Sequence, residues 1–243
     1  QRQMCIRDSS TTVRGQRDAK SGAERSIRGE EVMTRARSTP YDFLRLVPNM
    51  VIGLHEGGGK APQYMLRGFD ADHGTDLGMY FDGIPINEVS HVHGLGYLDV
   101  HFIIPELIQR IDVKKGPYDA EDGAFATAGS IRLTTRDFVP QNEVGYTFGS
   151  FESHRALGIF SPDLGKNVKG IFAVEGYGQN GFTAAGANKR YNVFSKVGFD
   201  FGAGSKLSVM ALSYGADWNA PGLMADRQLA MGLSRFGAWN PYD

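Results

Sequence analysis

The amino-acid sequence predicts an α+β domain followed by the start of an antiparallel transmembrane β-barrel. Up to about residue 138, short strand patterns, one helix signal and several turn pairs alternate at irregular spacing, which is typical of a small mixed domain. Beyond that point apolar and polar residues alternate over longer segments. The alternation and the length of about ten residues are those of a membrane-spanning β-strand.

Composition limits the function classes. The chain has 243 residues, of which 41% are hydrophobic and 22% are charged, as expected for a folded protein. The net charge of -1 gives no general attraction to nucleic acid, so no nucleic-acid partner is expected. The single cysteine, Cys5, excludes a disulfide framework and a cysteine zinc site. No apolar run reaches the ~18 residues of a spanning helix.

We expect the sequence to be a piece of a longer protein. It begins with Gln1, lacks the apolar core of a secretory signal, and ends at Asp243 without a closing signal. Residues 1–20 are interpreted as a flexible or partly artefactual segment. Residues 21–138 form the predicted mixed domain, and residues 139–243 hold the first strands of the barrel, about five in number.

The mixed domain is expected to begin with a strand over residues 26–32. A helix follows, capped by Ser38 or Thr39, with Pro40 at a position where its missing N–H costs nothing. Pro48 ends this helix. The chain then enters a Gly-rich loop.

Four further elements complete the domain. Residues 79–86 predict a hairpin around Asp82 and Gly83, a pair that readily adopts positive φ. Residues 105–109 predict one helical turn. Residues 110–114 and 130–136 predict strands, the first because its apolar residues lie on one face.

Five strands are predicted after residue 138. Closed membrane barrels need about eight strands, so five cannot close. An open edge would leave backbone groups unpaired in lipid, at several kcal/mol each. Residues 205–218 are apolar on both faces, which keeps open the alternative of a soluble five-stranded sheet.

Four short motifs occur in a characteristic order. They are Leu-Arg-Gly-Phe at residues 66–69, Asp-Gly-Ile-Pro-Ile-Asn at 82–87, Arg-Ile-Asp-Val-Lys-Lys-Gly-Pro at 110–117 and Ala-Gly-Ser-Ile at 128–131. Each motif alone is an ordinary turn or strand signal. Together they resemble the plug domain of a TonB-dependent outer-membrane receptor. The resemblance covers about 115 residues, whereas the barrel is inferred from its alternation only.

This resemblance implies a transporter in the outer membrane of a Gram-negative bacterium, with a multi-pass β-barrel. The complete protein would take up a scarce extracellular nutrient, most often an iron–siderophore or another metal chelate. Its implied partners are TonB with its inner-membrane energising complex, outer-membrane lipid and the nutrient ligand. No cofactor is implied.

Histidines are the candidate substrate-binding residues. His91 and His93 are two residues apart, so an extended backbone would place both imidazoles on one face. With Asp72 or His73 they would form a three-ligand site for copper, nickel or zinc. Together with His55, these residues are expected at the apex of the plug. The alternative is that they are polar residues in solvent-facing or pore-facing loops.

The resemblance also implies that Arg67 and Lys115 anchor the plug to carboxylates of the barrel wall. Lys115 stands where the family often has Arg, and it lacks the bidentate guanidinium fork. Alternatively, both are surface bases worth under ~1 kcal/mol each. Four glycines are interpreted as backbone turn positions: Gly68, Gly83, Gly116 and Gly129.

Enzyme functions find little support in the sequence. It has no Gly-x-Ser-x-Gly elbow, no His-Glu-x-x-His motif and no dinucleotide fingerprint. We therefore expect a protein that is not an enzyme. Two alternatives remain: a soluble or surface-attached β-rich binding module without transport activity and, with less support, a hydrolase that uses a histidine-bound metal.

Overall fold

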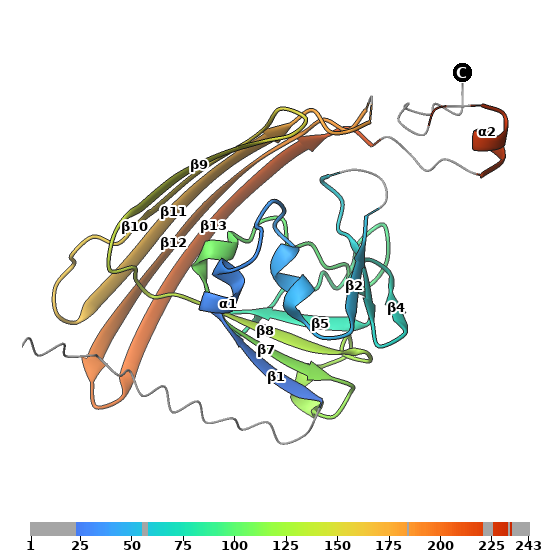
Figure 1. The fold of residues 1–243 in the computed structure, drawn as a ribbon. Helices are drawn as coiled ribbons and strands as arrows, with labels where there is room; N and C mark the ends of the chain where they lie inside the picture. The colour runs from blue at the N-terminus through green and yellow to red at the C-terminus, as the bar shows by residue number, and fades with distance from the viewer. Residues whose placement is uncertain (1–22, 55–57, 184, 221–225, 233, 235–243) are drawn as a thin grey trace, which may run out of the picture.

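A computed structural model of the chain describes residues 23–54, 58–183, 185–220, 226–232 and 234. It contains an N-terminal α+β domain and, beside it, a tall curved antiparallel sheet (Figure 1). The predicted fold class is confirmed. We refer to the part from residue 23 to 138 as the N-terminal domain and to the curved sheet as the wall sheet.

The main sheet of the N-terminal domain has the strand order β1-β7-β8-β5-β6. Neighbouring strands are antiparallel except for β5 and β8, which are parallel. The strands are β1 (Glu24–Arg28), β5 (Leu77–Phe81), β6 (Ile84–Pro85), β7 (Ile108–Lys115) and β8 (Gly129–Thr135).

The N-terminal domain also contains a smaller sheet and several helical turns. The smaller sheet contains β2 (Met50–Gly53), β3 (Gln63–Leu66) and β4 (Phe69–Ala71), in that order. The helical turns are α1 (Gly29–Met33) and the 3-10 helices η1 (Asp42–Leu46), η2 (Asp72–Gly74), η3 (Pro105–Leu107) and η4 (Ala120–Asp122).

The first predicted strand is only half right, because β1 ends at Arg28 and a helix follows. The side chain of Glu31 accepts a hydrogen bond from the backbone N–H of Arg28 (3.1 Å), which satisfies a donor at the start of α1. Gly29 lies against the backbone of Ile108, where a side chain has no room. A capping contact and close packing thus override the strand pattern.

The predicted helix after Pro40 is present as η1, but its capping differs. The Asp42 carboxylate accepts a hydrogen bond from the backbone N–H of Thr39 (2.8 Å), and neither Ser38 nor Thr39 caps the helix with its side chain. The predicted hairpin at Asp82 and Gly83 is confirmed. Their φ angles of 48° and 85° are those of a two-residue turn that matches the twist of a hairpin.

The wall sheet is an antiparallel meander with its strands in sequence order. Its strands are β9 (Glu143–Gly149), β10 (Ser153–Phe160), β11 (Val168–Gln179), β12 (Asn188–Gly202) and β13 (Ser205–Trp218), and a short helix, α2 (Asp226–Ala230), follows. The sheet is open, with β9 and β13 at its edges. None of the described helices is long and apolar enough to cross a membrane.

The two faces of the wall sheet have different chemistry. The convex face carries exposed apolar side chains such as Val144, Tyr146 and Phe148, at 82%, 69% and 69% exposure. The concave face carries buried Arg155 and Glu175. Adjacent residues alternate between the two faces, as predicted for a strand with lipid on one side.

The concave face shares a hydrophobic core with the N-terminal domain. Ile159, Ile171 and Phe194 of the wall sheet belong to the same buried cluster as Leu77, Met79 and Ile131 of the main sheet, among others. The Phe194 ring meets the Phe81 ring edge-on, with 6.2 Å between centroids. The two parts are therefore packed together, although the exact boundary between them stays a prediction.

The opposite faces of β13 provide a test of which side meets lipid. Val209 points outward and is 55% exposed, whereas Ser208 faces the N-terminal domain near Lys196. We expect Val209→Arg in the complete protein to destabilise the inserted barrel by roughly 2 kcal/mol, because a cation would enter lipid. The measurement is the amount of folded protein in outer-membrane fractions, resolved by heat-modifiable migration.

Ser208→Arg is the matched control, since it places the same cation one residue away on the concave face. It should leave the amount of folded protein near the wild-type level. Equal loss in both variants would contradict the assignment of the convex face to lipid.

Candidate functional site

The strongest polar contact between the two parts is a bidentate ion pair. Arg155 of β10 donates two hydrogen bonds to Glu106 of η3, with Nη1–Oε1 at 2.7 Å and Nη2–Oε2 at 2.8 Å. Both side chains are more than 90% buried. This fork-to-fork geometry is the strongest arrangement that a guanidinium and a carboxylate adopt.

The pair continues as a network into both parts. On the wall, Glu175 of β11 accepts from Arg155 Nε (3.0 Å) and from Arg190 Nη2 (2.8 Å), and it is fully buried. On the domain side, Arg37 Nε donates to Glu106 (2.9 Å). Asn192 of β12 donates both to Glu175 and to the backbone carbonyl of His101, each at 3.1 Å.

This network keeps Glu106 ionised. Burial raises the pKa of the Glu106 carboxyl, but the hydrogen bonds and positive charge of Arg155, with a further bond from Arg37, outweigh it and hold the pKa below the ordinary value of 4.5. The carboxylate is therefore charged at neutral pH. Breaking the contact would leave a buried charge without its partner, which is costly.

A second contact lies at the β5–β6 turn. Lys196 of β12 forms ion pairs with Asp82 (3.1 Å) and Asp137 (2.9 Å). It also donates to Thr135 Oγ1 (3.1 Å). At both contacts the wall supplies the cation and the N-terminal side supplies the carboxylate.

Arg67 and Lys115, the predicted anchors, lie elsewhere on the N-terminal domain. Arg67 is exposed, with φ at 54°, and its Nη1 donates weakly to the backbone carbonyl of Lys115 (3.4 Å). The Lys115 side chain is largely buried. Neither residue makes an ion pair with another residue in the described part of the chain. Their contact with wall carboxylates stays a prediction.

The four predicted turn glycines all have positive φ: 87° at Gly68, 85° at Gly83, 106° at Gly116 and 150° at Gly129. Gly129 is also crowded, because a Cβ there would collide with the backbone carbonyl of Lys114. Both observations agree with a backbone role.

The histidines gather around Tyr97. The His91 ring stacks on the Tyr97 ring at 3.9 Å between centroids and an angle of 16°, and the His93 ring stacks on His91 at 5.3 Å and 30°. The His73 ring lies 5.7 Å from Tyr97. We refer to His73, His91, His93 and Tyr97 as the histidine cluster.

The cluster does not form by the predicted extended backbone. His91 and His93 lie in a turn, in which the Gly94 N–H donates to the His91 carbonyl (3.1 Å). The His93 N–H donates to His91 Nδ1 (3.2 Å), and His73 Nδ1 lies 2.7 Å from the Ala61 carbonyl. Two ring nitrogens are thus engaged with backbone.

The described residues contain no group of three or more His, Cys, Asp or Glu side chains positioned to hold a metal ion. Asp72 is close to His73, with Oδ1 3.5 Å from Nε2, and its side chain is 65% exposed. His55 lies outside the described residues. Metal binding by His91 and His93 stays a prediction.

The cluster is placed toward one end of the wall sheet. The Tyr97 hydroxyl accepts from the Ala61 N–H (2.9 Å), and the preceding loop at Gly59 packs against the ring of Trp218, the last residue of β13. We call this the Trp218 end of the wall sheet. The other end, where β11 begins, is the Lys169 end.

Sequence reasoning missed the residues that hold the two parts together. It placed Glu106 only within the predicted helical turn at residues 105–109, and it gave Glu175 no role in this contact. A usable signal existed, because Arg155, Glu175 and Lys196 fall on the buried face of alternating strands. Charged residues on such a face need partners. Their partners cannot be identified from strand periodicity.

The N-terminal domain matches a known family. Residues 16–130 match the model of the TonB-dependent Receptor Plug Domain. Among curated proteins, the chain is similar to the Heme transporter BhuA of Brucella suis biovar 1 (strain 1330), with 28% identity over 151 residues. That match covers 62% of this chain and 18% of the relative.

Solved structures share the fold of both parts. The ferric yersiniabactin uptake receptor FyuA from Yersinia pestis matches with a TM-score of 0.66 and 16% identity, over 79% of this chain and 31% of that protein. The Copper transporter OprC matches with a TM-score of 0.65 and 16% identity, over 82% and 31%. The chain thus spans less than a third of these proteins.

The Arg155–Glu106 pair can be tested in the complete protein. We expect Glu106→Gln to weaken docking of the N-terminal domain by about 3 kcal/mol, because Arg155 loses one of its two buried carboxylates. The measurement is the urea concentration at which the domain becomes accessible to protease. Glu121→Gln, an exposed position in the same domain, is the control and should match wild type.

Docking should also depend on pH through Glu106. The pKa of the Glu106 carboxyl is lowered in the docked state. Its charge therefore contributes fully to the stability of docking above about pH 4.5, and this contribution is lost as the pH falls through the lowered pKa. Protease accessibility should therefore rise below pH 4.5. The rise should be smaller in Glu106→Gln, and identical pH profiles would contradict the role of this carboxylate.

Proposed function

Because the chain belongs to the TonB-dependent receptor family, with its plug domain at residues 16–130, we propose that the complete protein imports a scarce nutrient across the outer membrane. The N-terminal domain is the plug, and the wall sheet is part of the surrounding barrel. The protein would bind and move its cargo without making or breaking bonds in it, so it would act as a transporter and not as an enzyme.

The observation that carries this proposal is the docking of the plug on the concave face of the wall sheet through charged contacts. Arg155–Glu106 and Lys196–Asp82 join groups that water can solvate once they separate. A plug that has to move during transport benefits from such contacts, because hydration offsets part of their loss. The exposed apolar convex face supports a lipid-facing wall and argues against a soluble binding module.

The proposed cycle begins at the outer surface. The nutrient would bind at the Trp218 end, where the histidine cluster lies. TonB and its inner-membrane energising complex would then act on the plug from the periplasm. The plug would rearrange against the wall and open a path for the cargo.

We propose a metal chelate as cargo, with an iron–siderophore complex as the first candidate. The three similar proteins named above bear names that concern metals or their complexes: heme, ferric yersiniabactin and copper. His91 and His93 are the proposed contacts, since His91 is half-buried and His93 exposed on the Tyr97 stack. His73, Asp72 and His55 would contribute from neighbouring loops. Imidazole is a good ligand for transition metals and also stacks on flat chelates.

The histidine proposal is tested by changing both residues. In the complete receptor, His91→Ala with His93→Ala should reduce uptake at least tenfold, because the two imidazoles proposed to contact the cargo are lost while the apolar core keeps its side chains. The measurement is accumulation of radiolabelled iron by cells supplied with individual ferric siderophores. The amount of receptor in the outer membrane should stay constant.

His154→Ala is the matched control. His154 is an exposed histidine of β10, where its ring meets the Tyr146 hydroxyl on the convex face. This variant should take up iron at the wild-type rate. Wild-type uptake by the double variant would contradict the role of the cluster, while failure of every ferric siderophore in the wild type would contradict the proposed cargo.

A further inference from the structure

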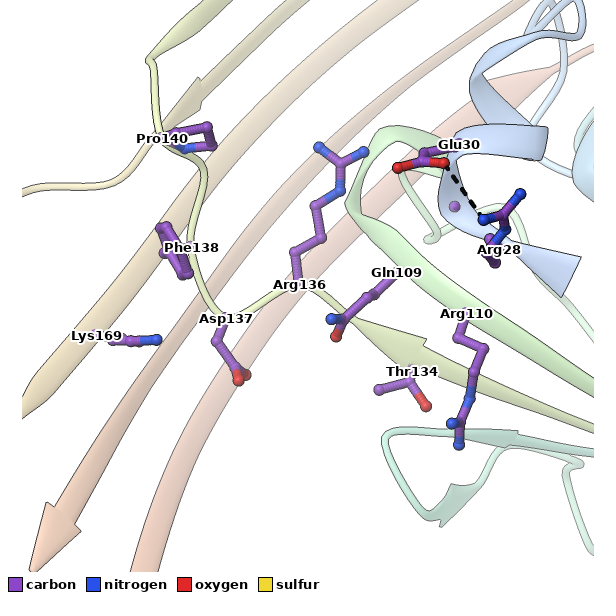
Figure 2. A pocket seen from close by; sticks show the side chains of 11 residues that line it. Arg28, Glu30, Gln109, Arg110, Thr134, Arg136, Asp137, Phe138, Pro140 and Lys169 are labelled. Carbon is purple, nitrogen blue, oxygen red and sulfur yellow. Dashed lines mark ion pairs between the residues drawn. The ribbon is translucent and has the colours of Figure 1, made fainter. Parts of the chain in front are cut away.

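A basic pocket lies at the opposite end of the plug from the histidine cluster. Its volume is about 700 Å³, and it opens between the plug and the Lys169 end of the wall sheet. In Figure 2, Lys169 lies on the wall side and Arg28 and Arg110 lie on the plug side. Arg136, from the segment that links the two parts, lies between them.

Four cations line this pocket, against two carboxylates. The cations are Arg28, Arg110, Arg136 and Lys169, and the carboxylates are Glu30 and Asp137. Asp137 is already 2.9 Å from Lys196, outside the pocket lining. The Glu30 side chain is 84% exposed and reaches Arg28 only at 4.0 Å. The pocket therefore carries an excess of positive charge.

The individual cations are neutralised to different degrees. Arg110 has a close partner, since its Nε is 2.7 Å from Asp112. Arg136 is 3.8 Å from Glu143, which is longer than a hydrogen bond. Lys169 makes no ion pair within the described part of the chain, and its ammonium lies 4.5 Å from the centre of the Phe138 ring. Among the cations of the pocket, Arg136 therefore has only a distant carboxylate partner, and Lys169 has none in the described part of the chain.

The position of the pocket relates it to transport. Lys169 is the second residue of β11, and Gln179, at the Trp218 end, is the last. At about 3.3 Å per residue, roughly 33 Å of strand separates the two ends. A cargo that enters beside the histidine cluster and passes along the wall would reach this pocket on leaving.

We propose that this pocket is an exit subsite for a small anion that bears carboxylate or phosphate groups. The inference rests on the proposed uptake function, because only a transported cargo would need a site at this end. Guanidinium groups match the geometry of both anions. A volume of several hundred cubic ångströms admits a ligand of small-molecule size.

The test uses the purified complete receptor in detergent at low ionic strength. Citrate and inorganic pyrophosphate serve as separate probes, and calorimetry measures the affinity of each. We expect one of them to bind at a single site. In the variant with Arg136→Gln and Lys169→Gln, the dissociation constant of that probe should rise at least tenfold.

The matched control is Lys166→Gln with Lys206→Gln, which removes two exposed cations near the same end of the wall. Lys166 lies in the turn before β11, and Lys206 is the second residue of β13. Its affinity should equal that of wild type. A second measurement locates the site: with Thr134→Cys at the pocket wall, the bound probe should slow labelling by a maleimide at least fivefold. The background should carry no other reactive cysteine.

Each outcome decides the proposal. Binding of neither probe, equal affinity in the pocket variant and wild type, or labelling of Thr134→Cys unaffected by the probe would overturn it. Tighter binding of citrate would indicate a carboxylate ligand, and tighter binding of pyrophosphate would indicate a phosphate ligand. Because binding by the purified receptor needs no TonB, probe binding in a receptor that imports nothing would refute the proposed function and with it the exit role of the pocket, while anion binding at the pocket would stand.

Discussion

The bidentate contact between Arg155 and Glu106 is the interaction on which the arrangement of the two parts depends. Both groups are buried, and each would be left charged without its partner if the plug and the wall separated without water entry. Glu175 orients Arg155 from the wall, and Arg37 holds Glu106 from the plug. Each member of the pair therefore has a partner within its own part that orients its side chain.

The charges of this network do not cancel. Three guanidiniums, those of Arg37, Arg155 and Arg190, meet two carboxylates, those of Glu106 and Glu175. The excess positive charge is partly compensated by a cation–π contact of Arg190, whose guanidinium lies 4.0 Å from the centre of the Tyr177 ring. A network with a surplus cation favours the ionised state of its carboxylates. This agrees with the lowered pKa of Glu106.

The same network constrains the register of the wall. Adjacent residues of a strand point to opposite faces, so a slip of β10 by one residue would turn Arg155 toward the convex face and bring a neighbour such as Ala156 to face Glu106. Lys196 imposes the same requirement on β12, because Asp82 and Asp137 are its partners. Buried ion pairs contribute little to net stability in general, but here they specify one pairing of strands and plug.

The features that sequence reasoning found are those set by local backbone chemistry. The Asp82–Gly83 turn and the alternation around Val144 need only neighbouring residues, and both appear in the structure as predicted. The contact of Arg155 with Glu106 joins residues 49 positions apart, and no periodicity indicates it. The stacking of His91 on Tyr97 depends on a turn that the spacing of the histidines does not specify.

The interface combines apolar and charged contacts, and these respond differently to separation. Phe194 packs on Phe81, and exposing such rings to water has no compensating gain. Arg155 and Glu106 regain hydration once water enters between them, which offsets part of the loss of their contact. These charged contacts lie on the concave face, which extends from the Trp218 end to the Lys169 end. Its two ends present different chemistry, imidazoles at one and guanidiniums with a lysine at the other. Under the proposed transport function, a cargo that suits both ends would combine a metal or an aromatic surface with negative charge, which is a narrower class than either end alone would select.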